Sequence, residues 1–473
     1  MTARVEDPQT RLDELTALAA EAFIYGFPLV FDLQEVDRFA RAGMGSLAAS
    51  PLNVFSHATG LAGPKDTFVS VNNDSIYSIA NVDTSGGPVR LEVPDTDGRY
   101  YVLQFVDAWT NNFAYVGRRA TGTTAGVFLL VPPGWDGADP DDATVIRFPT
   151  AIASIVGRWA VDGEHDLPAV QALQRQLTLV ASGAGAGLPE PTPELPEALA
   201  FFERMRLWMQ AFPPAARDLD HQQRFEPLWA DRSEALTTAL RNGYAAGRER
   251  LEQALKSGGS PQQNGWSLTY HAFDYNLDFF EVGALDEERW KLPDDATRYL
   301  LRAMSARAGL WGNHAYEAAY AMVYDDGAGE PLDGAHRYEL RFAKTPPVGA
   351  FWSVTMYDTP DFFLVDNPAS RYSIGDRTPG LRYADDGSLT LVLQHDEPAE
   401  PERAANWLPT PAGPFRPILR MYEPADAVFD GTYVLPPIER QPVTQPSSAT
   451  GGASAKGPAN THDPVANASV APS

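Results

Sequence analysis

Residues 71–83 read VNNDSIYSIANVD, and residues 98–117 read GRYYVLQFVDAWTNNFAYVG. Apolar and polar residues alternate in both stretches, and Asn, Asp and Gly separate the runs at hairpin-like spacing. The runs PVRLEVPD (88–95) and GVFLLVPP (126–133) have the same short, turn-bounded pattern. The sequence therefore predicts an antiparallel sheet or sandwich that begins near Thr67 and extends to about Trp159.

The same pattern returns near the C-terminus. From about Arg337 the strand-like runs are RYELRFA (337–343), AFWSVTMYD (350–358), SLTLVLQ (388–394) and RPILRMYEP (416–424). Turns are expected at residues 358–360 and 385–387, where Asp, Gly and Pro gather. These runs predict a second β module.

Helical periodicity occupies the rest of the chain. A first helix is expected from a cap at Thr10, with an interruption at Pro28 and a second helix over 30–43. Further helices are predicted at 168–182, 196–212, 232–259 and 294–324.

The predicted fold is α+β and β-dominated, with two antiparallel β-sandwich modules joined by a helical segment. The predicted divisions are N-terminal helices plus a β module (1–160), a helical segment (161–324) with a Gly/Pro linker near 182–196, a C-terminal β-sandwich (325–440) and a disordered tail (441–473).

The composition excludes several classes of protein. The chain has 62 acidic and 37 basic residues, a formal net charge of −25 and no cysteine. Such a charge repels polyanions unless a basic patch opposes it, and the basic residues are scattered. Without Cys there are no disulfides, thiolate metal sites or Cys nucleophiles. We expect no nucleic-acid partner, and the sequence leaves the oligomeric state unknown.

The start of the chain contains acids and no uninterrupted apolar core, unlike a secretory signal. No stretch approaches the roughly 18 apolar residues of a membrane span. We therefore expect no membrane span and a cytoplasmic location, with a periplasmic or secreted one open if a signal has been removed.

Several long, aromatic-rich motifs resemble a known pair of protein families. VNNDSIYSIANVD and the run that begins GRYYVLQFVDAWTNNFAYVG resemble domain of unknown function 1254 (DUF1254). GLWGN (309–313), PPVGAFWSVTMYD (346–358) and NWLPTPAGPFRPILRMYEP (406–424) are similar to its usual C-terminal partner, DUF1214. The resemblance implies a jelly-roll-like C-terminal β-sandwich and implies no agreed activity.

Polar residues gather on the N-terminal strands, where Asn and Asp are poor strand formers. The candidate catalytic residues are Asp74 or Asp107 as base and Arg158 as the anion-binding or charge-stabilising group. The candidate ligand-binding residues carry amide, phenol or indole groups and are Asn73, Tyr77, Trp109, Asn111, Asn112 and Tyr115. If Asp74 and Asp107 project to one face, they could flank a bound ligand. The competing interpretation is a set of turn residues that satisfy local backbone groups.

A second polar set in the C-terminal module has the same two interpretations: Asp366, Asn367, Arg371, Tyr372 and Arg377. The aromatic residues of that module, Trp352, Tyr357 and Trp407, are expected in the core rather than as sugar platforms.

The histidine spacing does not favour a metal site. No two of the eight His residues have the i, i+2 or i, i+4 spacing, and no HExxH occurs. His314 with Glu317, and His271 with Asp274, lie three apart on predicted helices, a spacing that many helices have by chance. We expect no metal.

Known cofactor and nucleophile motifs are also missing. SGAGAGL (182–188) follows a predicted helix and precedes Pro189, so it is expected to be a linker rather than a phosphate loop. Neither a Walker motif nor a G-x-S-x-G motif occurs. We expect no cofactor.

The sequence thus suggests a polar small-molecule site on the N-terminal β module, with metal-independent acid–base chemistry if the protein is an enzyme. The alternative is a non-catalytic carbohydrate-binding or assembly protein that uses jelly-roll surfaces. A concave pocket with a carboxyl of shifted pKa would favour catalysis, and a flat exposed aromatic patch would favour binding or assembly.

Overall fold

The structure, a computed structural model, describes residues 7–66, 70–192, 194–276, 292 and 294–442. The tail predicted to be disordered, 441–473, lies outside the described residues except for Gln441 and Pro442. The described residues up to Gln441 belong to one compact unit.

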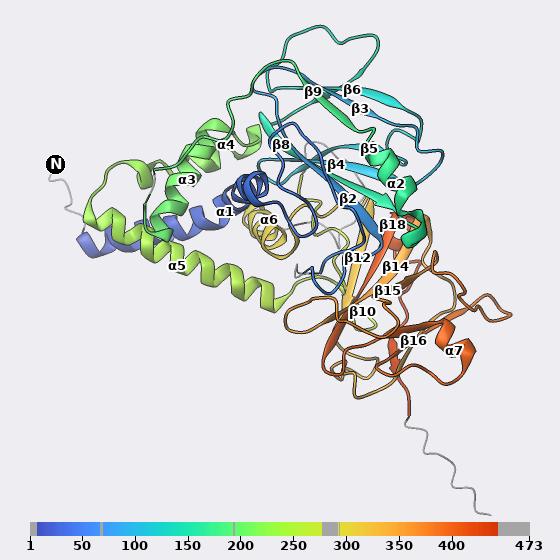
Figure 1. Ribbon diagram of the computed structural model, residues 1–473. Helices are drawn as coiled ribbons and strands as arrows, with labels where there is room; N and C mark the ends of the chain where they lie inside the picture. The colour runs from blue at the N-terminus through green and yellow to red at the C-terminus, as the bar shows by residue number, and fades with distance from the viewer. Residues whose placement is uncertain (1–6, 67–69, 193, 277–291, 293, 443–473) are drawn as a thin grey trace, which may run out of the picture. The chain divides into compact units, whose positions relative to one another are not determined.

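Two β-sheets form the N-terminal module (Figure 1). The first is antiparallel throughout, in the order β1-β2-β8-β4-β5. The second has the order β7-β6-β3-β9 and one parallel pair, β6 with β7. The strands are β1 Ser56–His57, β2 Ser75–Asp83, β3 Val89–Val93, β4 Tyr101–Asp107, β5 Asn112–Gly117, β6 Gly126–Val131, β7 Thr144–Arg147, β8 Ile152–Ala160 and β9 Thr178–Ala181. The predicted antiparallel β-structure is confirmed here.

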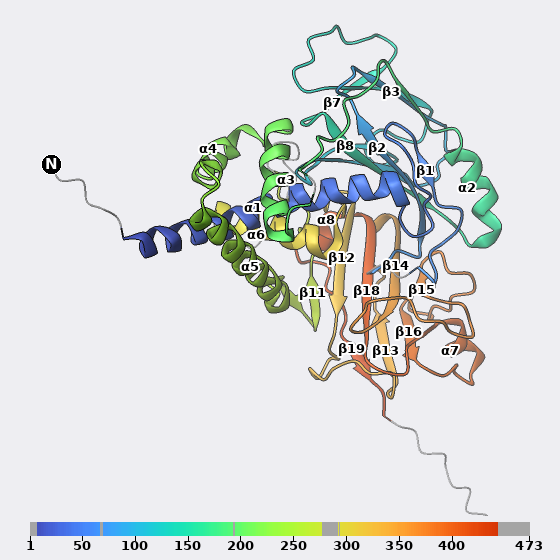
Figure 2. The same ribbon diagram turned by 60° about the vertical axis from the view of Figure 1, so that its left-hand side comes forward.

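The C-terminal β-structure also has two sheets (Figure 2). A six-stranded sheet has the order β10-β11-β12-β18-β14-β15, and a four-stranded one the order β17-β16-β13-β19. The strands are β10 Gln262–Gln263, β11 Trp266–Leu268, β12 Ala318–Val323, β13 Tyr338–Phe342, β14 Val348–Asp358, β15 Ser373–Gly375, β16 Leu389–Gln394, β17 Trp407–Pro409, β18 Phe415–Pro424 and β19 Ile438–Arg440. The fold is thus α+β, with two sheets in each module and helices between them.

The larger helices gather around α1, which contacts α3, α5 and α6 (Figures 1 and 2). The helices are α1 Pro8–Ala42, α2 Leu167–Gln174, α3 Glu197–Ala211, α4 Leu219–Gln223, α5 Glu234–Ser257, α6 Asp295–Gly309, α7 Pro401–Ala405 and α8 Asp426–Phe429, with short 3-10 turns η1 Glu164–Asp166, η2 Ala216–Asp218 and η3 Glu226–Trp229.

The prediction of a break at Pro28 is wrong, because α1 continues through this residue. A proline inside a helix costs about 3 kcal/mol, since it removes a hydrogen bond and crowds the preceding turn. Both halves of α1 are buried, for example at Phe23 and Leu33, and this packing outweighs the cost.

The sequence predicts no membrane span, whereas α1, among the described helices, has the length and apolar composition to cross a membrane. Half of its apolar stretch is buried inside the protein. Core helices and N-terminal signal sequences share this composition.

Two other predicted helices are too long. The helix predicted over 168–182 ends at Gln174, and Thr178–Ala181 form β9 beside β3. The helix predicted over 294–324 ends at Gly309, and Ala318–Val323 form β12 between β11 and β18. Both runs contain good helix formers, and in both the apolar and polar residues also alternate as in a strand. Cross-strand pairing therefore decides between the helical and the strand pattern.

A buried interface joins the two modules. Alternation along β18 directs Leu419 and Met421 into the C-terminal core and Arg420 and Tyr422 to the opposite face. Tyr422 packs there in a cluster with residues of the N-terminal sheet, Tyr100 and Val102 among them. The face between the five-stranded and six-stranded sheets therefore combines apolar contacts with polar groups.

The helices α1 and α5 approach closely because α5 carries two glycines. A Cβ on Gly243 would lie 2.3 Å from the Cβ of Ala19, and a Cβ on Gly247 would lie 2.7 Å from the Cβ of Phe23. The same helix also buries Leu236 and Leu251.

We predict that Gly247→Val lowers the free energy of unfolding by about 2 kcal/mol, because the added side chain overpacks against α1. Ala246→Val, on the exposed face of the same turn, is the matched control and should cost only a few tenths of a kcal/mol. Urea denaturation of the two variants measures the difference. Equal losses would contradict the close contact.

Glu317 provides a pH-sensitive group at the interface. The Tyr100 hydroxyl donates a 2.6 Å hydrogen bond to its carboxylate. Burial, and to a lesser degree Glu423, raises the pKa of Glu317 from 4.5 to about 7, against the opposing effects of Tyr100, Arg119 and Arg158. The folded protein thus keeps a proton that the unfolded chain releases.

We predict that this proton makes stability fall as pH rises from 4.5 to about 7. The loss is up to about 3 kcal/mol and is complete above the folded-state pKa. Glu317→Gln cannot ionise, so its stability relative to the wild type should increase over this window. Denaturation of both proteins at several pH values tests this, and parallel stability curves would show that Glu317 does not hold the proton.

Candidate functional site

The structure does not bring Asp74 and Asp107 together. Asp107 pairs with Ala153 of β8, whereas Ser75, which follows Asp74, pairs with Ala160 of the same strand. Seven residues of extended strand separate these positions, which is roughly 23 Å at 3.3 Å per residue. The suggestion that the two carboxylates flank one ligand is therefore wrong, and the predicted residues divide into two groups.

The first group lines a pocket of about 270 Å³ between the N-terminal sheet and the helical segment. Three predicted residues lie there, Asp107, Trp109 and Asn111. The walls also include the apolar residues Pro149, Pro213, Pro214, Ala215 and Ala216 and the polar residues Arg217, Asp218, Tyr275, Asn276, Arg298 and Arg302.

Asp107 ends β4 and organises the turn that follows. One of its carboxylate oxygens accepts hydrogen bonds from the backbone N–H groups of Trp109 and Asn111, both 2.9 Å long. The Asn111 amide donates to both oxygens at 3.2 and 3.0 Å. This local satisfaction of backbone groups is what the competing turn interpretation expected, and the same side chain also lines the pocket.

The environment of Asp107 favours its protonated form. Burial raises the pKa of this carboxyl above its ordinary value, while the bonds from Asn111 and the charge of Arg302 partly oppose the shift. Thr110, in the same turn, has a φ of 66°, a conformation that is strained for a β-branched residue. Such strain often accompanies functional sites.

Sequence reasoning missed Arg302 and Tyr275. The Arg302 guanidinium donates from Nη2 to the Asn111 amide oxygen at 2.9 Å, and its buried Nε has no hydrogen-bond partner. It lies 5.2 Å from the Tyr275 ring centroid. The Tyr275 hydroxyl donates to the Thr110 carbonyl at 2.9 Å, and burial raises its pKa to about 12.

The pocket lining also includes an ionised acid. Arg298 forms a 2.5 Å ion pair with Asp218, and the Tyr299 hydroxyl donates to the same carboxylate at 2.8 Å. Burial alone would raise the pKa of Asp218, but the Arg298 contacts lower it overall. The pocket therefore has two carboxyl groups whose environments move their pKa values in opposite directions.

Trp109 contributes less than predicted. Its indole N–H donates to the Phe212 carbonyl at 2.8 Å, and its ring packs against Tyr25 with 5.1 Å between centroids. The ring is 1% exposed, so it supports the pocket from the core.

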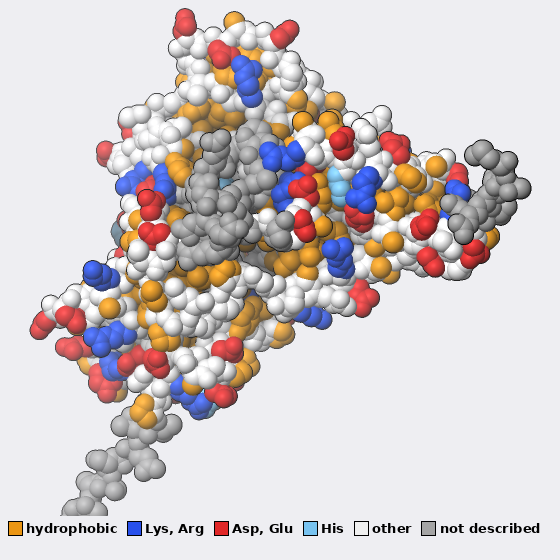
Figure 3. All heavy atoms as spheres, turned by 180° about the vertical axis from the view of Figure 1, so that it is seen from behind, with side chains coloured by type: hydrophobic (Ala, Val, Ile, Leu, Met, Phe, Trp, Pro, Cys, Tyr) orange, Lys and Arg blue, Asp and Glu red, His pale blue; other side chains and the backbone are white. Residues whose placement is uncertain are grey.

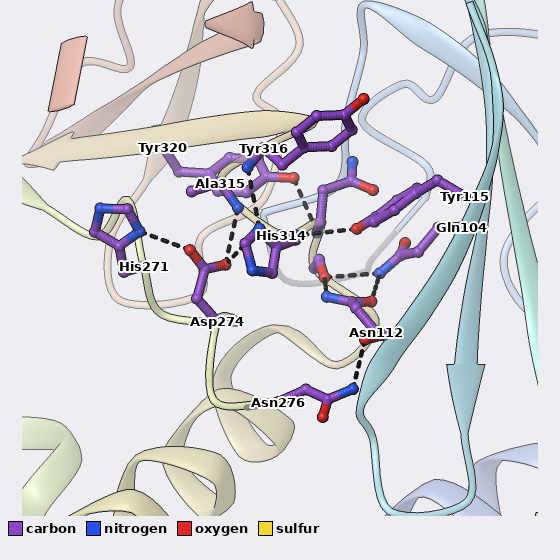
Figure 4. A network of polar contacts seen from close by, with 12 residues as sticks. Gln104, Asn112, Tyr115, His271, Asp274, Asn276, His314, Ala315, Tyr316 and Tyr320 are labelled. Atoms are coloured by element: carbon purple, nitrogen blue, oxygen red, sulfur yellow. Dashed lines mark hydrogen bonds and ion pairs between the residues drawn. The ribbon is translucent and has the colours of Figure 1, made fainter. Parts of the chain in front are cut away.

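The second group lies at the interface between the sheets, in part shown in Figure 4. Asn112 accepts from Gln104 at 2.6 Å, and the Tyr115 hydroxyl accepts from the backbone N–H of His314 at 2.8 Å. Asp74 accepts from the Tyr422 hydroxyl at 3.0 Å. Asn73 accepts from Ser373 at 3.1 Å.

Tyr77 and Arg158 face each other across β2 and β8 at the same interface. They form a registered pair, and the Arg158 guanidinium lies 5.4 Å from the Tyr77 ring centroid.

The histidine pairs lie in turns rather than on the predicted helices. Asp274 lies between two imidazoles, with Oδ2 at 2.6 Å from Nδ1 of His271 and Oδ1 at 3.3 Å from Nδ1 of His314 (Figure 4). Glu317 turns away to Tyr100. In the part of the chain that the structure describes, no three His, Asp or Glu side chains form a group that could hold a metal ion.

The C-terminal candidates have structural contacts. Arg371 donates to the Trp407 carbonyl at 2.7 Å, and its backbone N–H donates to Asn367 in a turn. The Arg377 guanidinium stacks on Phe351 at 3.6 Å. Asp366 and Tyr372 lie beside this turn. The aromatic residues predicted for the core are buried there: Trp352, Tyr357 and Trp407.

Two solved structures are similar to this chain to different degrees. A Vibrio parahaemolyticus protein known from a crystal structure, VPA0106, is 24% identical, with a TM-score of 0.69 over 90% of this chain and 100% of its own. An uncharacterised Burkholderia cenocepacia protein is 12% identical, with a TM-score of 0.42 over 92% and 96%. No curated protein has a matching sequence. The likeness to the Vibrio protein shows a shared fold.

Two family matches cover the β modules. Residues 52–181 match the family described as protein of unknown function DUF1254. Residues 317–426 match the family described as protein of unknown function DUF1214. The chain thus carries an N-terminal segment that matches DUF1254 and a C-terminal segment that matches DUF1214.

Proposed function

We propose that the chain binds a small polar molecule in the Asp107 pocket and performs metal-independent acid–base chemistry on it. One observation carries this proposal: a concave pocket contains a buried carboxyl whose pKa is raised. Catalytic sites combine these two features because an acid or base works best with a pKa near the working pH. The volume, about 270 Å³, is suited to a small ligand.

In this proposal Asp107 takes up and returns the proton. Arg302, on the same wall, has an N–H without a partner and supplies positive charge for negative charge on the ligand. The sequence predicts Arg158 for that role. Arg158 lies five residues along β8 from Ala153, the partner of Asp107, so Arg302 takes its place.

The alternative, a carbohydrate-binding or assembly protein with jelly-roll-like surfaces, would need a flat exposed aromatic patch. Among the described residues the exposed large aromatic side chains are Tyr324 and Tyr383, at 41% and 48% exposure. Acidic, basic and hydrophobic side chains are interspersed on the face shown in Figure 3. These observations favour the pocket.

We predict that Asp107→Asn abolishes the function of the pocket with a moderate loss of stability. The measurement is a thermal-shift screen with small hydroxy acids, keto acids and amides, followed by turnover assays on any ligand found. The variant should weaken turnover about a hundredfold or more, because it loses the ionisable group. Damage to the turn should lower stability by about 1–3 kcal/mol.

Asp83→Asn is the matched control. Asp83 ends β2, is 2% exposed like Asp107, and accepts hydrogen bonds from the backbone N–H groups of Ser85 and Gly187 at 2.8 Å. It does not line the pocket. Asp83→Asn should therefore lose similar stability and keep the ligand response. Equal ligand responses in the two variants would leave Asp107 with only a role in the turn.

A further inference from the structure

Two buried arginines lie at the interface between the modules, one on each of the two sheets that meet there. Arg158 belongs to β8 and is 6% exposed, and Arg420 belongs to β18 and is 5% exposed. Tyr77 and Tyr422 lie within electrostatic range of both guanidinium groups. Asn313 connects the two sheets, because it accepts from Arg158 at 3.2 Å while its backbone N–H donates to Tyr320, the registered neighbour of Arg420.

Both guanidinium groups are held by neutral acceptors. Arg158 donates to the Gln104 side chain at 2.7 Å and to the Trp311 carbonyl at 2.8 Å. Arg420 donates to Thr355 at 3.0 Å and to the Ser70 carbonyl at 2.8 Å. Within the described residues, neither group has a carboxylate oxygen within the 4.0 Å of an ion pair.

The charges around the two arginines do not balance. Asp74 is the acid that acts on Arg420, and it is held by Tyr422 and Ser353. Glu317 acts on Arg158 and shares a hydrogen bond with Tyr100. Neither Arg158 nor Arg420 forms an ion pair with these acids within the described residues. Buried charges are normally paired because their desolvation is costly, so this arrangement has room for one more negative charge.

Three residues beside the arginines keep part of their surface. Tyr77, Tyr320 and Met322 are partly exposed as whole residues, although their neighbours Arg158, Arg420 and Tyr422 are buried. Planar guanidinium groups match the two oxygens of a carboxylate, and aromatic rings suit its apolar body.

We propose that Arg158 and Arg420 form a binding site for a small monocarboxylate, separate from the Asp107 pocket. The carboxylate lies between the two guanidinium groups and supplies the missing negative charge. Tyr77, Tyr320 and Met322 contact the remainder of the ligand.

Calorimetric titration of the full chain with benzoate, near pH 6 so that Glu317 keeps its proton, tests the site. Sodium chloride at equal ionic strength, acetate, inorganic phosphate and sulfate are titrated in parallel. We expect saturable binding of benzoate. Arg158→Gln and Arg420→Gln should each weaken it about tenfold to a hundredfold, because each removes charge-assisted hydrogen bonds.

Arg416→Gln is the matched control. Arg416 lies on the same strand and face as Arg420, is also 5% exposed, and donates to Tyr324 at 3.2 Å and to Ser70. This variant and Asp107→Asn should bind benzoate as the wild type does. If a glutamine variant does not fold, Arg158→Lys and Arg420→Lys keep the charge and should weaken binding about tenfold.

Three results would overturn the proposal. The first is that no carboxylate gives a saturable heat of binding with the wild type. The second is that phosphate or sulfate binds more tightly than benzoate. The third is that Arg416→Gln or Asp107→Asn loses as much benzoate affinity as the Arg158 and Arg420 variants. If Asp107→Asn loses benzoate affinity while the Arg158 and Arg420 variants keep it, the carboxylate binds in the Asp107 pocket, and the proposed acid–base function stays intact.

Discussion

The structure depends on the burial of a polar sheet face. The six-stranded sheet has an apolar face in the C-terminal core, and its other face carries Arg420 and Tyr422. That second face is covered by the N-terminal sheet, so its polar groups must find partners inside the protein. Tyr422 donates to Asp74 and Arg420 to the Ser70 carbonyl. From the N-terminal sheet, Arg158 donates to Asn313 and Tyr100 to Glu317. The hydrogen bonds hold the modules in one register, which apolar packing alone would specify less strictly.

One sheet consequently borders both proposed sites. Strand β8 lies between β2 and β4, and its two ends meet different neighbours. Near Ala160 the sheet faces the C-terminal module and contributes Arg158, whereas near Ala153 it lies beside Asp107 and the helical segment. The two sites differ in charge, since Asp107 has Arg302 nearby while Arg158 has neutral acceptors.

The strands could be predicted from the sequence because the alternation of polar and apolar residues is visible within each short segment. The errors concern segments where local preference and tertiary packing disagree. At Pro28 the burial of α1 outweighs the proline penalty. In β12 the run AAYAMV satisfies a helical and an alternating pattern equally, and its hydrogen bonds to β18, almost a hundred residues later, decide the outcome. No local window of sequence contains that partner.

The same limit explains the candidate site. Asp107, Trp109 and Asn111 were found because three polar or aromatic residues follow one strand. Arg302 was missed because its role comes from Asn111, which lies 191 residues away.

One local signal for Arg302 did exist. Arg298 and Arg302 are four residues apart on the face of α6 that also carries the apolar residues Tyr299, Ala303 and Ala306. An arginine on the buried face of a helix must have an acceptor, an acid or a ligand there, since its charge cannot remain in the core alone. Asp218 and Asp295 satisfy Arg298, while the buried Nε of Arg302 has no hydrogen-bond partner, and that difference is the reason for assigning Arg302 to the proposed site.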